Sequence, residues 1–189
     1  MVTIKPLIQK TILFLVMILF LLAAGSARAG FNMYLFISDS SGTITGEVTN
    51  TGFAGQIWVT NFSWGVVNPV SSGGTVGKPV FNAFTITKTL DLASPVLMED
   101  CAVGSPLKSV VLSFQSQAGK QILFYTISLS NGFITSVNSS GSTTDGRPLE
   151  TVTLTYSTIN WKYQQLDENG NPVGSPVSHG YDLSTGTGS

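Results

Sequence analysis

Two side-chain types that often carry catalysis occur in this chain only as His179 and Cys101. A lone histidine cannot form a two-histidine metal site, and no G-x-S-x-G or H-E-x-x-H pattern supplies a nucleophile or a second ligand. We expect His179 to lie at the surface or in an interface. Cys101 is expected to be a buried structural thiol, with a disulfide between two chains as the alternative. The sequence therefore predicts no enzyme and no catalytic, metal or cofactor site.

Two further patterns resemble reactive sites but fail on spacing. The segment from Gly73 to Lys78 is similar to a phosphate-binding loop, yet Pro79 stands where a hydroxyl must bind magnesium and Ser72 where the first glycine belongs. We interpret this segment as part of a flexible loop. Glu99 and Asp100 are adjacent, so a helix would turn them about 100° apart, and they do not form an acid–base pair.

The chain as a whole has few charges and many apolar and aromatic residues. Of its 189 residues, 42% are hydrophobic and 10% are aromatic, but only 10% are charged, against roughly 25% in an average soluble domain. This composition excludes a disordered polyelectrolyte. A net charge of −1 does not indicate the basic surface that nucleic-acid binding requires. Interface cores are depleted in charge, which favours a role in assembly.

The first 29 residues predict a secretory leader rather than a part of the fold. Lys5 and Lys10 precede an uninterrupted apolar run from Ile12 to Ala24, and Ala27-Arg28-Ala29 matches a small-residue cleavage site. The run is shorter than the ~20 residues that a spanning helix needs, and an uncleaved N-terminal membrane anchor is the alternative. Cleavage after Ala29 predicts a secreted or periplasmic chain in which six basic residues face ten acidic ones.

Alternating and β-branched segments predict one β domain over residues 30–183, followed by a flexible tail at 184–189. The expected strands are Met33–Asp39, Gln56–Val67, Val80–Lys88, Lys108–Gln115, Gln121–Leu129, Phe133–Asn138 and Thr151–Tyr163. The last one changes phase at Ser157-Thr158, which predicts a β-bulge in a bent strand. Ser94 as N-cap, Pro95 and Gly104 predict one short helix. The fold class is therefore mainly β, a compact barrel or sandwich with one helix.

Several short motifs, taken in order along the chain, resemble one known family. They are Phe62-Ser63-Trp64-Gly65-Val66 before Pro69 and a glycine-rich loop, Phe84 to Lys88 with Leu90-Asp91 and Ala93-Ser94-Pro95, Pro148-Leu149-Glu150 before Tyr156, Ile159, Trp161 and Tyr163, and Gly180 to Leu183. Their order is similar to that of the haemolysin-coregulated protein (Hcp) family, the tube proteins of type VI secretion systems. The resemblance covers roughly residues 33 to 183.

The resemblance implies a compact Hcp-like β-barrel with a helix at its side, assembling into a six-fold ring with a central channel. Rings of that family stack into a tube, hold effector proteins in the lumen and meet a spike protein, without catalysis or a cofactor. The loop that reaches a neighbouring ring would correspond here to Val70, Ser71, Ser72, Gly73, Gly74, Thr75, Val76, Gly77, Lys78 and Pro79. Tube subunits of the family carry no leader, so the leader implies a secreted homologue that forms rings or filaments outside the cytoplasm.

A second interpretation of an exported β domain is a binding module for a carbohydrate or an envelope partner. Trp58, Trp64 and Trp161 would then form an exposed aromatic platform. Their positions within predicted strands favour packing into the core instead.

Overall fold

The computed structural model describes residues 30–117 and 120–189. The predicted leader, residues 1–29, lies outside the described residues, as do Ala118 and Gly119 of the connection predicted between two strands. Within the described residues, no helix combines the length and the apolar character needed to cross a membrane.

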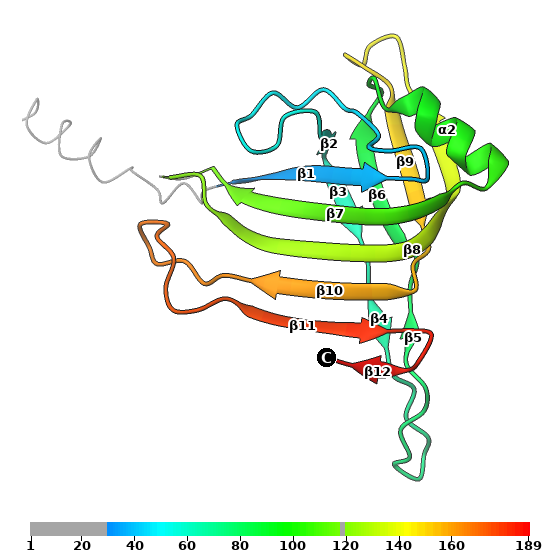
Figure 1. Ribbon diagram of the computed structural model, residues 1–189, viewed down its shortest axis with the longest axis vertical. Coiled ribbons are helices and arrows are strands. Elements are labelled where there is room, and N and C mark those ends of the chain that lie inside the picture. Colours follow the sequence, from blue (N-terminus) through cyan, green and yellow to red (C-terminus); the bar gives the residue numbers. More distant parts are fainter. Residues whose placement is uncertain (1–29, 118–119) are drawn as a thin grey trace, which may run out of the picture. The chain divides into compact units, whose positions relative to one another are not determined.

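Ten strands form one antiparallel sheet that folds over on itself (Figure 1). Its first part has the order β12-β11-β10-β8-β7-β1-β2. The strands of this part are β1 (Phe31–Ser38), β2 (Ile57–Val59), β7 (Pro106–Ser116), β8 (Leu123–Ser140), β10 (Thr158–Tyr163), β11 (Val177–Asp182) and β12 (Thr187–Gly188). Residues 184–189, for which the sequence predicts a flexible tail, thus include a short strand paired with β11.

The second part of the sheet has the order β3-β6-β9-β8, with strands β3 (Asn61–Ser63), β6 (Phe84–Thr89) and β9 (Leu149–Leu154). Strand β8 belongs to both parts because its first half pairs with β7 and β10 and its second half with β9. Its partner changes from β10 to β9 between Ser130 and Ile134, and the bend there includes Asn131, whose φ is +54°, and Gly132. A Cβ on Gly132 would lie 1.8 Å from the carbonyl oxygen of Thr155, so the bend requires glycine.

The hydrophobic core lies between these two parts. Leu35, Leu112 and Ile127 are register neighbours on β1, β7 and β8, and each is at most 1% exposed. They belong to one core cluster with Phe84 and Ile86 of β6. Burial alternates along β6, with Phe84 and Ile86 inside, whereas Met33, Tyr34 and Leu35 of β1 are buried in succession. Each buried aliphatic or aromatic side chain stabilises the fold by about 1.5–3 kcal/mol. The fold is therefore the mainly β, barrel-like architecture that the sequence predicts.

The single helix of the described residues is α2 (Ser94–Val103), which lies beside the second half of β8 (Figure 1). Gly104 ends it in the left-handed conformation, with φ +72°, as predicted. The predicted N-cap is wrong: Ala93 holds that position without a side-chain hydrogen bond, while Ser94 is the first helical residue. The hydroxyl of Ser94 is engaged elsewhere, in a buried polar cluster described below.

Three predicted strands are each divided in the structure. The segment Gln56–Val67 contains β2, β3 and the short β4 (Val66–Val67), because the chain leaves the first part of the sheet at Thr60 and joins the second. The segment Val80–Lys88 contains β5 (Val80–Phe81), which pairs only with β4, and β6 of the large sheet. The segment Thr151–Tyr163 is not one bulged strand: it contains β9 and β10, which belong to different parts of the sheet. The phase change at Ser157-Thr158 marks this crossing. Phe133–Asn138 is not separate but continues β8.

Candidate assembly surface

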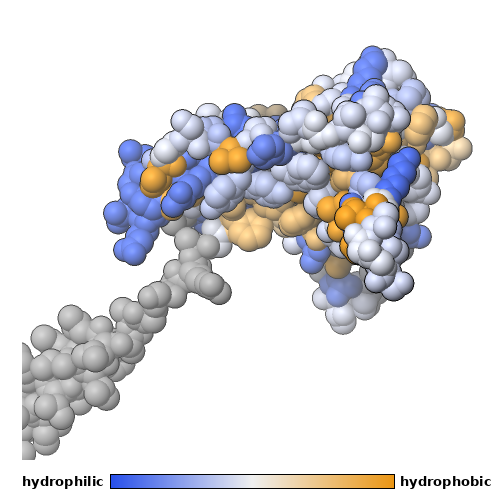
Figure 2. Space-filling view, turned by 90° about the horizontal axis from the view of Figure 1, so that it is seen from below, coloured by the Kyte–Doolittle hydropathy of each residue, from blue (hydrophilic) through white to orange (hydrophobic). Residues whose placement is uncertain are grey.

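A two-stranded arm, residues 66–81, projects from one end of the described unit (Figure 1). It consists of β4, β5 (Val80–Phe81) and the glycine-rich segment between them. Its exposed large apolar side chains are those of Val66, Val67, Val70, Val76 and Val80. Figure 2 looks at the molecule from this end and shows hydrophobic side chains on its surface among weakly polar ones. An exposed apolar projection of this kind is typical of a contact surface.

The segment Val70–Pro79, interpreted from the sequence as a flexible loop, continues the hairpin in an ordered form. Val70 and Val76 form an antiparallel bridge, and the amide of Ser71 donates to the carbonyl of Thr75 at 3.0 Å. Gly74 turns the chain with φ +80°, which only glycine adopts readily. The arm therefore presents Val70 and Val76, which are 62% and 61% exposed, on a defined backbone.

Aromatic side chains anchor the base of the arm to β10 and β11. The ring of Trp64 lies 5.3 Å from that of Trp161, and the ring of Phe81 stacks on Tyr181 at 4.9 Å. The indole Nε1 of Trp64 donates to the hydroxyl of Tyr156, which in turn donates to the carbonyl of Asn82. These contacts on both sides of the arm fix the direction in which it projects.

The three tryptophans therefore do not form one platform. Trp64 and Trp161 are half-buried at the base of the arm. Trp58 lies apart, with its ring 4.8 Å from that of Tyr34, and 37% of it is exposed. The core packing favoured by the sequence is thus confirmed for two of the three.

Charged residues of the family-like motifs form one buried cluster, which is not among the sites expected from the sequence. Lys88 of β6 and Glu150 of β9 are register partners and both are 0% exposed. The Nζ of Lys88 lies 2.7 Å from a carboxylate oxygen of Glu150 and 2.7 Å from one of Asp91. Ser94 accepts a hydrogen bond from Lys88 at 2.9 Å and donates one to Glu150, and Ser139 donates to Glu150 at 3.0 Å.

This cluster connects β6, β9 and β8 to the start of α2. The pKa of Glu150 lies below its ordinary value of 4.5: burial raises it, but hydrogen bonds from Lys88 and Ser94 and the charge of Lys88 outweigh burial. Glu150 is therefore ionised at neutral pH, and Lys88 has a partner for each of its three protons. The cluster orients the helix and is closed to any ligand.

A second buried acid lies on the same helix. Asp100 is 5% exposed, and its Oδ2 atom has no hydrogen-bond partner. Burial raises the pKa of Asp100, and the negative charges of Asp39 and Glu99 add to this effect, against a hydrogen bond from Ser105 that lowers it. A side-chain hydrogen bond with Asp39 raises the pKa of Asp100 further.

The remaining candidate residues lie apart from each other. His179 is exposed on β11, with its Nδ1 3.3 Å from the carbonyl oxygen of Ser189. Cys101 is a free thiol, half-buried on α2 rather than fully buried. Among residues 30–117 and 120–189, no group of three His, Cys, Asp or Glu side chains is arranged to hold a metal ion.

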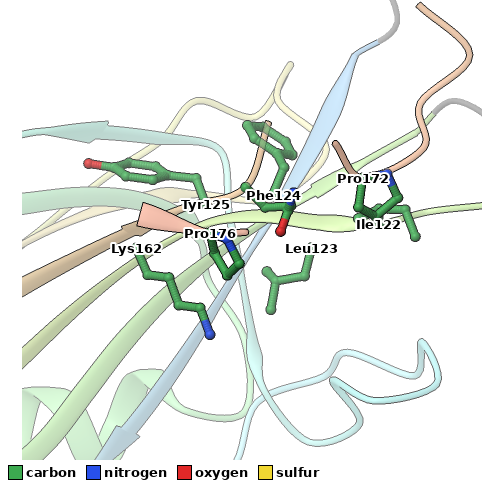
Figure 3. A pocket seen from close by; sticks show the side chains of 8 residues that line it. Ile122, Leu123, Phe124, Tyr125, Lys162, Pro172 and Pro176 are labelled. Atoms are coloured by element: carbon green, nitrogen blue, oxygen red, sulfur yellow. The ribbon is translucent and has the colours of Figure 1, made fainter. Parts of the chain in front are cut away.

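An apolar hollow of about 240 Å³ lies where β8 begins and β10 ends (Figure 3). It is lined by Ile122, Leu123, Phe124, Tyr125, Lys162, Gln164, Pro172 and Pro176. Lys162 is its only charged side chain, so the hollow lacks the converging polar groups that an enzyme site or a specific small-molecule site needs. The arm is thus the more distinctive surface.

Comparisons with known proteins agree with this fold. The family model described as "Type VI secretion system effector, Hcp" matches residues 34–163. Two proteins of Pseudomonas aeruginosa are each 29% identical: "Protein hcp1" over 52% of this chain and 62% of its own length, and "Major exported protein" over 71% and 82%. The chain thus spans less than two thirds of the first of these relatives.

Solved structures are similar over most of the chain. A structure described as that of a type six secretion system protein is 27% identical, with a TM-score of 0.79 over 85% of this chain and all of the other. The Hcp1 protein from E. coli EAEC 042 is 27% identical, with a TM-score of 0.67 over 80% of this chain and 98% of its own. The chain belongs to the Hcp family of type VI secretion proteins.

Proposed function

We propose that this protein is a structural subunit that assembles with copies of itself into six-membered rings, and that the arm stacks one ring on the next. The observation that carries this proposal is the ordered arm with exposed valines, anchored by aromatic contacts at its base. A surface that is ordered, apolar and uncovered loses little entropy when a partner covers it. The family membership supports self-assembly into stacked rings, and no catalytic activity is proposed.

Export is the second element of the proposal. The sequence from Lys5 to Ala29 has the features of a leader, and cleavage after Ala29 would release the folded unit that begins at Phe31. The related "Major exported protein" carries export in its name. Rings or filaments would then form in the periplasm or outside the cell, where effector or spike proteins are the candidate partners. We propose neither a cofactor nor a nucleic-acid partner for this protein.

The test uses the chain from Gly30 onward. Light scattering or native mass spectrometry is expected to give six times the mass of one protomer, and negative-stain electron microscopy is expected to show rings. A protein that stays monomeric at every concentration would refute the proposal. Cell fractionation of the full chain, with the N-terminus of the product sequenced, checks cleavage after Ala29 and separates it from a retained membrane anchor.

A shortened arm tests the role assigned to its tip. Deleting residues 72–75 and joining Ser71 to Val76 through two glycines removes the tip but leaves the anchored base. Rings are expected to persist while stacks disappear. Loss of the rings themselves would show that the arm makes contacts within a ring instead.

A further inference from the structure

Asparagine followed directly by glycine occurs twice in the chain, as Asn131-Gly132 and as Asn169-Gly170. Such a pair is chemically labile, because glycine has no Cβ to hinder the attack of its amide nitrogen on the side-chain carbonyl of the asparagine. The attack requires the backbone of the pair to leave its folded conformation. The structure around each pair therefore decides whether it reacts.

The first pair is held within the sheet. Asn131 and Gly132 form the bend of β8, and Gly132 is the register partner of Leu107 on β7. The carbonyl of Asn131 accepts a hydrogen bond from the hydroxyl of Ser157 at 2.9 Å, and a Cβ on Gly132 would lie 1.8 Å from the carbonyl oxygen of Thr155. Rotation of this peptide therefore requires β8 to separate from its neighbours, which costs a large part of the free energy of unfolding.

The second pair lies in an exposed turn between β10 and β11, in the orange loop of Figure 1. The amide of Gly170 donates to the carbonyl of Asp167 at 3.0 Å and closes a turn of the β type. A single bridge between Leu166 and Pro172 follows. Within the described residues, the side-chain amide of Asn169 has no hydrogen-bond partner. Opening the turn thus breaks a few local hydrogen bonds and leaves β10 and β11 paired.

The carboxylate of Asp167 holds this turn together. Its Oδ1 atom accepts from the backbone amides of Asn169 at 2.9 Å and Asn171 at 2.8 Å, and its Oδ2 atom accepts from the side-chain amide of Asn171 at 3.1 Å. The hydrogen bonds from Asn171 above all keep the pKa of Asp167 below its ordinary value of 3.8, so this carboxylate is ionised at neutral pH. The ease with which the turn opens therefore depends on one side chain.

We propose that Asn169 is a site of spontaneous deamidation and that the fold protects Asn131 from the same reaction. The backbone nitrogen of Gly170 loses its proton and forms a bond to Cγ of Asn169, while the bond from Cγ to the side-chain nitrogen breaks and ammonia leaves. Water then opens the resulting cyclic imide at either of its carbonyls, which gives aspartate or isoaspartate. Water is the only co-reactant. The inference is independent of the proposed function, because the reaction takes place within one protomer.

The reaction changes both the charge and the geometry of the turn. It adds a carboxylate beside those of Asp167 and Glu168, and in isoaspartate it lengthens the backbone by a methylene. Either product weakens the turn, because like charges repel and the amide of residue 169 no longer lies in place to bind Asp167. Pro172 follows the turn and lines the apolar hollow at the start of β8, so modification is expected to alter this wall of the hollow.

Incubation of the purified full chain at 37 °C, at pH 6 and at pH 8.5, tests the inference. Samples are digested with pepsin in acid, which suppresses further reaction, and the peptides with Asn131 and Asn169 are identified by mass. The Asn169 peptide is expected to gain the mass difference between a hydroxyl and an amino group and to split into two forms. It is expected to react more than about tenfold faster than the Asn131 peptide, and faster at pH 8.5, where the attacking amide loses its proton more readily.

Three variants separate the chemistry from the structure. Asn169→Gln keeps an amide, but its longer side chain forms the cyclic product much more slowly, so this peptide is expected to stay unchanged. Asp167→Ala leaves the reacting pair intact but removes the acceptor that holds the turn, and it is expected to raise the rate about threefold or more. Asp145→Ala is the matched control, because Asp145 accepts from the amide of Ser142 at 2.8 Å in another exposed turn, and it is expected to leave the rate unchanged.

The same incubation in urea provides the reference for the unfolded chain, in which Asn131 and Asn169 are expected to react at similar rates. An Asn169 peptide that stays unchanged at pH 8.5 would overturn the inference. Equal rates at both sites in the folded protein would show that the sheet does not protect Asn131. If Asn131 stays slow in urea, its protection does not come from the fold, and if Asp167→Ala leaves the rate unchanged, the turn does not control the reaction.

Discussion

Replacing Lys88 by methionine is expected to cost a large part of the folding free energy. Lys88 and Glu150 are fully buried, and the substitution leaves the carboxylates of Glu150 and Asp91 without their cation. Removing one partner of a buried ion pair typically costs 3–5 kcal/mol, because the remaining charge is desolvated and uncompensated. With about 2 kcal/mol per molar urea as the slope, the midpoint of urea unfolding shifts down by about 2 M.

The double variant Lys88→Met with Glu150→Leu distinguishes two contributions to the lost stability. One is the loss of the attraction between Lys88 and Glu150, and the other is the cost of leaving the buried Glu150 carboxylate without a counterion. This variant removes both charges, and Asp91 still accepts a hydrogen bond from the amide of Ala93 at 3.0 Å. Apolar replacements of a complete buried pair are often close to neutral. The double variant is therefore expected to recover the part of the loss that the uncompensated Glu150 causes, but not the part that comes from Asp91, which still lacks its cation. Glu150→Leu alone costs less than Lys88→Met, because Lys88 keeps Asp91 as its counterion.

The pH dependence provides an independent check with a defined sign. In the native protein the pKa of Glu150 is below 4.5, so its contribution to stability is present above that value and is lost as pH falls through the folded-state pKa. In Lys88→Met, burial acts on Glu150 without the cation and raises its pKa. The penalty of the substitution is therefore largest at pH 7 and smaller near pH 4, where the buried acid is neutral.

The assay is urea unfolding followed by tryptophan fluorescence, at one fixed protomer concentration because assembly adds to apparent stability. Lys162→Met, at an exposed lysine on β10, is the control and is expected to change stability by less than about 0.5 kcal/mol. A loss below about 1 kcal/mol for Lys88→Met, or a double variant as unstable as the sum of the single variants, would refute the reasoning.

Three further predictions concern positions outside this cluster. Asp100→Asn is expected to raise the free energy of unfolding at pH 7 by about 1 kcal/mol, and by less near pH 4. Because the pKa of Asp100 is raised in the native protein, native stability falls as pH rises above 3.8, and the uncharged amide removes this pH dependence. Gly132→Ala is expected to cost more than about 2 kcal/mol by chemical unfolding, because its Cβ meets the carbonyl of Thr155, whereas Gly73→Ala, with open space around it, is neutral. Tyr156→Phe removes two hydrogen bonds at the base of the arm and is expected to cost about 1–2 kcal/mol and to speed proteolysis within the arm.

The sequence contains a signal for the buried cluster of Lys88, Asp91, Ser94 and Glu150. Phe84 and Ile86 alternate on the inward face of their strand, and Lys88 continues the same face. Val152 and Leu154 likewise follow Glu150 on the inward face of β9. If β6 and β9 are neighbouring strands, inward-facing residues of opposite charge predict a buried ion pair, because an unpaired buried charge is too costly. The local sequence pattern does not reveal this pairing, because β6 and β9 lie far apart in the sequence.

The divided strands could not be predicted from local pattern. Residues 57–63 read as one β segment because each half has β-branched and aromatic residues, and only their partners differ. The same holds for β9 and β10: the apolar pattern changes phase between them, but it does not reveal the change of neighbouring strands that causes the phase change. The glycine-rich tip of the arm is a similar case: its order comes from backbone hydrogen bonds and the Val70–Val76 bridge, which composition does not reveal.

The location of the motif residues also limits what the family resemblance says about partners. Lys88, Asp91, Ser94 and Glu150 carry much of the resemblance, yet they are buried and act on the position of α2. A relative that keeps them keeps the fold and the relation between helix and sheet. In the proposed stacking, the side chains that would meet another copy are the exposed valines of the arm. Because such surface positions change without a cost in folding, two family members at 29% identity can share one architecture and still differ in the partners they accept. Recognition between copies of this chain is therefore expected to depend on these few contacts rather than on the motifs that identify the family.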